Sequence, residues 1–75
     1  MPLSLAALNK LYYIQRIAGT DETRCYLASL GFIPGAEISI ISAFSGNFII
    51  KILGSSIAID KALAKKIIIT DLKVT

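Results

Sequence analysis

The segment spanning residues 27–40, LASLGFIPGAEISI, contains a helix end, a turn and the start of a strand. An apolar helical stripe ends at Leu30, and Gly31 follows at the position where glycine closes a helix in the left-handed conformation. Pro34 pre-sets the φ angle of the second turn position, and Gly35 tolerates the positive φ of the third. The chain therefore leaves a helix and reverses directly into a strand at this corner.

The helix before the corner is predicted from its charges and from its apolar stripe. Asp21 and Glu22 place negative charge where a helix N-terminus is partly positive, and Thr20 or Asp21 is the expected cap. Cys25 lies off the stripe, and Arg24 flanks it. The stripe has the i, i+3, i+4, i+7 spacing of a single helical face and comprises Thr23, Tyr26, Leu27 and Leu30.

Short runs of β-branched and aromatic residues, bounded by turn residues, predict five strands. They lie at residues 11–17, 37–43, 48–53, 56–59 and 67–70. The alternation in the second run slips at Ile40 and Ile41, which predicts a bulge or a strong bend. Hairpin loops are predicted at residues 45–47 and 54–55. The three central strands should therefore run as a meander.

Two short helical turns are predicted from their capping residues. Ser4 is expected to cap a turn over residues 5–8, and Asp60 a turn over residues 61–66. Residues 71–75 are expected to form a frayed tail. The chain thus combines five strands with one substantial helix and two short turns.

A lone meander of this size leaves exposed strand edges, and closing it with the first and last strands removes them. We therefore predict a mainly β fold, a small SH3-like barrel of about five strands, in a single domain over residues 1–75. The helix lies in the connection between the first two strands. Its stripe is expected to cover an open end of the barrel.

The core of this fold has to come from side-chain packing alone. A chain of 75 residues buries only about 60% of its unfolded surface, which makes it marginally stable. A single cysteine excludes an internal disulfide, and there is no histidine. The chain compensates with 55% hydrophobic residues and a mean hydropathy of +0.70. Such a composition indicates either very tight packing or a surface covered by a partner.

The apolar runs do not predict insertion into a membrane. A spanning helix needs about 20 nearly continuous apolar residues, whereas the strongest run here, residues 48–53, is interrupted by Lys51. The first four residues lack the positive charge of a signal peptide, and a free thiol fits a reducing cytosol. We expect a cytoplasmic protein whose net charge of +3 permits an acidic partner without requiring one.

Catalytic and cofactor chemistry is not indicated. Histidine is absent and the carboxylates are scattered, while the adjacent Asp21 and Glu22 are explained as helix-start charges. Cys25 has no histidine partner that would activate it as a nucleophile. No metal-ligand spacing occurs, and residues 31–35 lead to a strand, unlike a phosphate-binding loop. We predict that the chain is not an enzyme and holds no cofactor or metal.

Two features are candidates for binding a partner. Lys61, Lys65 and Lys66 form the only basic cluster, but a solvated helix face explains it, and Tyr12 and Tyr13 lie far away in the sequence. Nucleic-acid binding would favour aromatic side chains among such charges, so a nucleic-acid partner is not favoured.

The second feature is the pair Phe32 and Ile33, which follows the helix. A helical stripe is usually core, but apolar residues in a loop beside a covered barrel end can form a docking knob. We therefore expect these two side chains to be accessible to a partner.

The order of these motifs resembles that of ferrous iron transport protein A, the FeoA family. The resemblance covers residues 3–70 and is carried by SLAAL, YYIQRIAG, YLASLGFIPGAEISII and IIKILGSSIAIDKALAKKIII. Its most specific parts are the Leu-x-x-Leu-Gly-x-x-Pro-Gly pattern at 27–35 and the hairpin at 54–60. The chain departs from the family at residues 9–10, where Pro-Gly is frequent, and at residues 44–47, where the family loop is often longer.

The resemblance implies an SH3-like barrel in the bacterial cytosol. It also implies a partner, the large ferrous iron permease FeoB with its cytosolic GTP-binding domain. The small protein would assist or regulate that permease through protein contact, at the inner face of the membrane and without inserting into it.

We expect the helix and the corner to carry this contact. The predicted contact residues are Arg24, Tyr26, Leu27, Leu30, Phe32 and Ile33. The residues expected to hold the backbone geometry are Gly31, Pro34, Gly35 and Gly54.

Two alternative functions remain open. The barrel also resembles the C-terminal domain of diphtheria-toxin-repressor-type metalloregulators, which would make the chain a free-standing regulatory module. A small nucleic-acid-binding barrel is the other alternative. Self-association through barrel strands is compatible with each of these functions.

Overall fold

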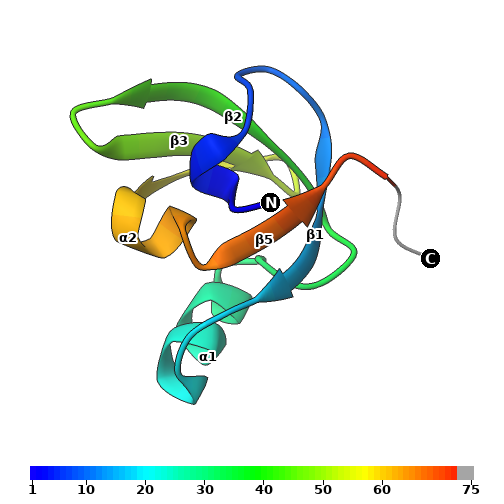
Figure 1. Ribbon diagram of the computed structural model, residues 1–75, viewed down its shortest axis with the longest axis vertical. Helices are drawn as coiled ribbons and strands as arrows, with labels where there is room; N and C mark the ends of the chain where they lie inside the picture. Colours follow the sequence, from blue (N-terminus) through cyan, green and yellow to red (C-terminus); the bar gives the residue numbers. More distant parts are fainter. Residues whose placement is uncertain (73–75) are drawn as a thin grey trace.

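In the computed structural model, which describes residues 1–72, one antiparallel sheet has the strand order β4-β3-β2-β1-β5 (Figure 1). The strands are β1 (Tyr12–Ile17), β2 (Glu37–Phe44), β3 (Asn47–Ile52), β4 (Ser55–Asp60) and β5 (Ile67–Thr70). The helical elements are η1 (Leu3–Leu5), α1 (Asp21–Ser29) and α2 (Lys61–Ala64). The predicted mainly β, SH3-like fold with its main helix between the first two strands is confirmed.

The two edges of the sheet differ in what borders them. The N-terminus borders β5, because the Met1 amino group donates to the Ile69 carbonyl at 2.8 Å and the Ile69 amide donates to the Met1 carbonyl at 2.7 Å. β4 has a strand neighbour only on its β3 side within residues 1–72. The expectation that the first and last strands remove every edge is therefore wrong at β4, since the chain passes from β4 to β5 through α2 instead of pairing them.

The core lies inside the curved sheet. Its only polar side-chain atom among the buried residues named below is the Tyr12 hydroxyl, which accepts a hydrogen bond from the Ala7 amide at 3.0 Å. Isoleucines dominate it, as expected for strands that pack β-branched side chains on one face. The buried side chains are Leu3, Tyr12, Ile14, Leu27, Phe32, Ile38, Ile40, Ile50, Ile52, Ile59, Ala64, Ile67 and Ile69.

Both central hairpins have two-residue turns with positive φ at both positions, as type I′ turns require. Ser45 and Gly46 form the first turn with φ of 48° and 76°, and Leu53 and Gly54 form the second with φ of 51° and 78°. The second turn thus lies one residue earlier than predicted. The predicted bulge is confirmed, because the β2–β3 register shifts between Ile40 and Ser42.

The short helical turns agree only in part with the prediction. Asp60 caps α2 by accepting from the Leu63 amide at 2.8 Å, although the helix ends at Ala64. The predicted turn over residues 5–8 is wrong: η1 lies earlier, with Pro2 at its N-cap and no side-chain cap. Proline suits a helix start because its missing amide would have no partner there, and Ser4 lies inside the turn. The predicted tail includes residues 73–75, which lie outside the described residues.

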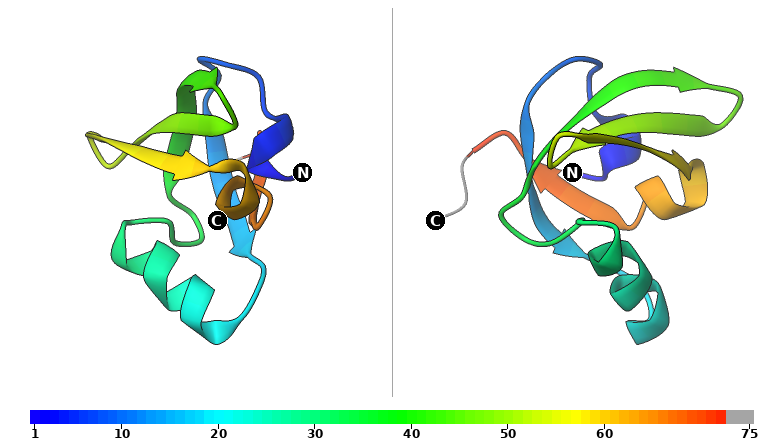
Figure 2. Two further views of the ribbon diagram at one scale, coloured as in Figure 1. Left: turned by 90° about the vertical axis from the view of Figure 1, so that its left-hand side faces the viewer. Right: turned by 180° about the vertical axis from the view of Figure 1, so that it is seen from behind.

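The helix α1 projects from one end of the sheet (Figure 2). Thr20 is its N-cap and accepts from the Thr23 amide at 3.2 Å, as predicted. Leu27 is its only buried residue, while Thr23 and Leu30 are half-buried. The expected covering of a barrel end therefore comes from the last turns of α1, and the first turns stand in solvent.

Candidate interaction surface

The corner, residues 30–36, begins with a Schellman motif, the paired hydrogen bonds that close a helix behind a left-handed glycine. Gly31 has a φ of +104°, and its amide donates to the Ala28 carbonyl at 3.0 Å. The Phe32 amide reaches back to the Leu27 carbonyl, also at 3.0 Å. This motif places the side chains of Leu27 and Phe32 together under the end of the helix.

The second half of the corner is fixed to β1. Ala36 donates to the Ile33 carbonyl at 3.1 Å across Pro34 and Gly35, and Gly35 has the positive φ of +89° that the predicted turn requires. The Gly35 amide also donates to the Ile14 carbonyl at 2.7 Å, and the Ile14 amide donates to the Ala36 carbonyl at 3.0 Å. The corner is therefore a rigid part of the barrel.

Leu27 and Phe32 are both 0% exposed, so the expectation that they present surface to a partner is wrong. The reason is the Schellman motif, which turns the residue after Gly31 inward against the last turn of the helix. Leu30 is half-buried and packs against the same core. These three residues hold the corner in place.

A cleft of about 610 Å³ lies between α1, the end of β1 and the corner. One wall of the cleft is a face of α1 that differs from the predicted apolar stripe. This face consists of Asp21, Arg24, Cys25 and Ala28. Arg16 and Ile17 of β1 form the opposite wall. The corner closes the cleft with Phe32, Ile33 and Pro34.

The cleft combines apolar surface with positive charge. Ile33 is 47% exposed on its rim, and Phe32 forms buried floor. Arg24 forms an exposed ion pair with Asp21, which contributes little stability because water screens it. Arg16 has no acidic partner within residues 1–72. A ligand of this cleft would therefore be largely apolar and carry a negative charge.

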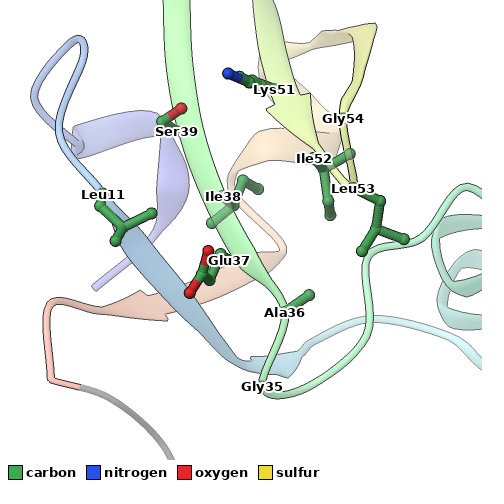
Figure 3. Close-up of a pocket in the computed structure, with 10 residues that line it drawn as sticks. All are labelled: Leu11, Gly35, Ala36, Glu37, Ile38, Ser39, Lys51, Ile52, Leu53 and Gly54. Carbon is green, nitrogen blue, oxygen red and sulfur yellow. The ribbon is translucent and has the colours of Figure 1, made fainter.

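A second hollow, of about 500 Å³, lies on the other side of the corner, over β2 (Figure 3). Leu11 and Leu53 flank it on opposite sides of β2, with exposures of 50% and 72%. Leu53 extends from the β3–β4 turn toward the corner, and its Cδ1 lies 3.0 Å from where a Cβ on Gly31 would be. Exposed apolar side chains thus flank the corner on both sides.

The predicted contact residues separate into three places. Arg24 and Ile33 meet in the cleft. Tyr26 is 54% exposed but does not line the cleft, because it lies two positions from Arg24 and so on another side of the helix. Leu27, Leu30 and Phe32 pack in the core beneath the corner. Gly54 was predicted only to hold backbone geometry, and it lies in the β3–β4 turn. The contact role of these residues stays a prediction.

Four surface residues of the candidate site were not predicted from the sequence. They are Arg16, Cys25, Pro34 and Leu53. Arg16 and Cys25 reach the cleft only because α1 folds back beside β1, and no local pattern indicates that. Leu53 did carry a signal: a leucine precedes glycine in a tight hairpin, where asparagine or aspartate is usual.

One of the two tyrosines considered for nucleic-acid stacking is buried in the core, where a base cannot stack on it. Tyr12 is 2% exposed, and its hydroxyl is already used by the Ala7 amide. Lys66 lies with its side chain along Gly19, and its carbonyl accepts from the Ala18 amide at 2.7 Å.

Within the described part of the chain, no three His, Cys, Asp or Glu side chains gather where they could hold a metal ion. None of the helices in residues 1–72 has the length and apolar character to cross a membrane.

The fold is shared with solved structures of FeoA proteins. The chain superposes on a crystal structure of the iron uptake regulatory protein FeoA with a TM-score of 0.88 and 30% identity, covering 96% of this chain and 97% of that one. The solution structure of iron(II) transport protein A from Clostridium thermocellum gives a TM-score of 0.87 at 27% identity, with 96% of this chain and 46% of that chain covered. The comparison with curated protein sequences gave no match.

A larger protein contains a similar domain. IdeR from T. acidophilum matches 95% of this chain with a TM-score of 0.82 and 28% identity, but only 33% of its own length is covered. Most of the length of IdeR therefore lies outside this match.

The sequence itself decides between these two groups. The model of the FeoA domain matches residues 1–71, which is nearly the whole chain. One solved FeoA protein shares this fold over 97% of its own length. The chain belongs to the FeoA family.

Proposed function

We propose that this chain is an accessory protein of ferrous iron uptake that acts by contact with a FeoB permease on the cytosolic side of the membrane. One observation supports this mode of action above others: the cleft beside α1 combines an exposed apolar rim with a guanidinium that has no acidic partner in residues 1–72. A FeoA protein from Stenotrophomonas maltophilia has been described as a candidate ferrous iron transport activating factor.

The cleft is suited to a protein segment because its floor is rigid and its helical wall is not. The corner is bonded to the end of α1 through Gly31 and Phe32 and to Ile14 of β1 through Gly35 and Ala36, whereas α1 buries only Leu27. An apolar anchor of the partner would fill the space between Ile33 and Ala28, and a carboxylate beside it would pair with Arg16. Such central anchors carry most of the binding energy of an interface.

The proposal is tested by measuring binding to purified FeoB with two variants and one matched control. Ile33→Ser and Arg16→Ala should each raise Kd about ten-fold, the effect of about 1.4 kcal/mol. Phe44→Ser is the control, since Phe44 is 57% exposed on the β2–β3 hairpin and lines neither hollow. Unchanged binding of both cleft variants, or an equal loss in the control, would contradict the proposal.

Cys25 offers a direct probe of the same site. It is the single cysteine of the chain, it is exposed, and it lines the cleft. Saturating FeoB should slow its alkylation by a maleimide several-fold, and the Ile33→Ser variant should lose this protection. Alkylation at the same rate with and without bound FeoB would place the contact elsewhere.

The second candidate is a regulatory module that docks on a metal-dependent repressor, favoured by the match to a domain of IdeR. The same cleft would then receive a segment of the repressor. Binding to a purified repressor of this type, with no binding to FeoB, would favour this function over the first.

A further inference from the structure

The outer edge of β4 presents backbone groups without partners. Both hairpin turns set the direction in which these groups point. In each turn the flanking residues exchange hydrogen bonds, and the pairs along an antiparallel ladder then alternate. Ile52 and Ser55 flank the β3–β4 turn, so Ser55, Ile57 and Ile59 bond to β3. Ser56 and Ala58 therefore point their amides and carbonyls away from it.

The other hairpin gives the same result independently. Phe44 and Asn47 flank the β2–β3 turn, so Asn47 and every second residue after it bond to β2. Ile50 and Ile52 then point toward β4, in agreement with the first hairpin. Ser56 and Ala58 are exposed, and within residues 1–72 their outward groups have no hydrogen-bond partner.

This edge also lacks the devices that normally block pairing. Natural edge strands carry lysine, proline, a bulge or an inward-pointing charge. The segment 55–59 reads SSIAI, with no charge and no proline, and the β3–β4 register is regular throughout. By contrast, the other edge of the sheet is covered by the N-terminus.

We propose that β4 pairs with β4 of a second copy of this chain, antiparallel about a two-fold axis at Ile57. In this register Ser56 of each copy lies opposite Ala58 of the other, so their outward amides and carbonyls form four hydrogen bonds. Ile57 of both copies meets at the axis. Since Ile57 pairs with Ile50, the central row of the joined sheet reads Ile50, Ile57, Ile57, Ile50. Rows of β-branched side chains stabilise neighbouring strands.

The charges that flank β4 favour the same register. Asp60 of one copy lies opposite Gly54 of the other, and Lys61 lies opposite Leu53, so no two like charges face each other across the axis. Lys51 pairs with Ser56 on its own chain and stands three strands from its counterpart. A second copy therefore meets this edge without a direct contact between like charges, and the exposed Leu53 gains a neighbour.

Sedimentation equilibrium over a range of protein concentrations tests the proposal with two variants at one position. Ala58→Pro removes only the outward amide, because proline is tolerated where the amide of an edge strand faces solvent. Ala58→Val keeps that amide. We expect a concentration-dependent dimer for the wild type and Ala58→Val, and a monomer for Ala58→Pro. A wild type that stays monomeric at millimolar concentration, or an Ala58→Pro variant that dimerises equally, would overturn the proposal.

Disulfide trapping tests the register and does not depend on how Ala58→Pro folds. Ile57 of the two copies would form a non-hydrogen-bonded pair with Cα atoms about 4.5 Å apart, a separation that a disulfide can bridge. In a Cys25→Ser background, Ile57→Cys should form a covalent dimer on mild oxidation. Ser56→Cys is the matched control, since Ser56 does not face itself, and should give much less. Equal yields from both positions would show random collision and refute the pairing.

Discussion

At the scale of single residues, Leu53 combines an unfavourable backbone with an exposed side chain. Its φ is +51°, a conformation that costs an ordinary residue about 1–2 kcal/mol, and its side chain is 72% exposed. Asparagine tolerates this conformation better. We expect Leu53→Asn to raise the free energy of unfolding by about 0.5–1 kcal/mol in urea titrations and to weaken binding of FeoB.

Ser45 supplies the control for this prediction. It has the same conformation, with φ of +48°, in the β2–β3 turn, which lies away from the corner (Figure 1). Ser45→Asn should increase stability without any change in binding. If Leu53→Asn leaves binding unchanged as well, Leu53 is not part of the contact surface.

Burial of single residues was predictable where a local motif decides it. The pattern of Leu27, Gly31 and Phe32 contains the hydrophobic contact that accompanies a Schellman motif, so the sequence did carry the information that Phe32 lies inside. Treating Phe32 as a loop residue missed that information. Arg16 is different, because its role depends on a helix that follows it in the chain and folds back beside it.

At the scale of elements, α1 is the part of the fold that depends most on its cap. It has nine residues, and helices shorter than about 12–15 residues are marginal without tertiary packing. Loss of the Thr20 side chain should cost about 1 kcal/mol. We expect Thr20→Ala to speed amide hydrogen exchange in α1 about five-fold, while the exchange of the core strands changes much less.

Asp60→Ala is the matched control, because Asp60 caps α2 in the same way. It should speed exchange around α2 and leave α1 unaffected. Equal acceleration of α1 and the strands in Thr20→Ala would mean that α1 opens only when the whole barrel unfolds. Local opening is expected because Leu27 is the only buried residue of this helix.

Element boundaries were predictable where side chains fix them. Thr20 and Asp60 mark two helix starts by accepting backbone amides, and the register shift at Ile41 follows from a visible slip in alternation. The start of η1 was not found, because Pro2 begins that turn without a side-chain bond. A preference for serine caps led to the wrong residue there.

At the scale of the whole molecule, the alternation of apolar residues and the turn residues predicted the strands. They did not predict which edges of the sheet are paired or covered. Whether β4 pairs with β5 depends on the path of α2 between them, and on the N-terminus that covers β5 instead. These are contacts between the two ends of the chain, which no local pattern encodes. The same holds for the cleft, which exists only once α1, β1 and the corner have come together.

The charge of the whole chain makes a last prediction about partner binding. The net charge is +3, and the cleft contributes Arg16 and Arg24, of which only Arg24 has an acidic partner in residues 1–72. Electrostatic complementarity acts mainly on the association rate, and the Debye length falls from about 10 Å at 0.1 M salt to about 3 Å at 1 M. Raising the salt concentration should therefore slow association with FeoB several-fold, while dissociation changes little.

In stopped-flow measurements Arg16→Ala should flatten this salt dependence more than Lys61→Ala does, because both variants remove one exposed positive charge but only Arg16 lines the cleft. Equal flattening by both variants would show that the overall charge steers association and that the cleft has no special part in it.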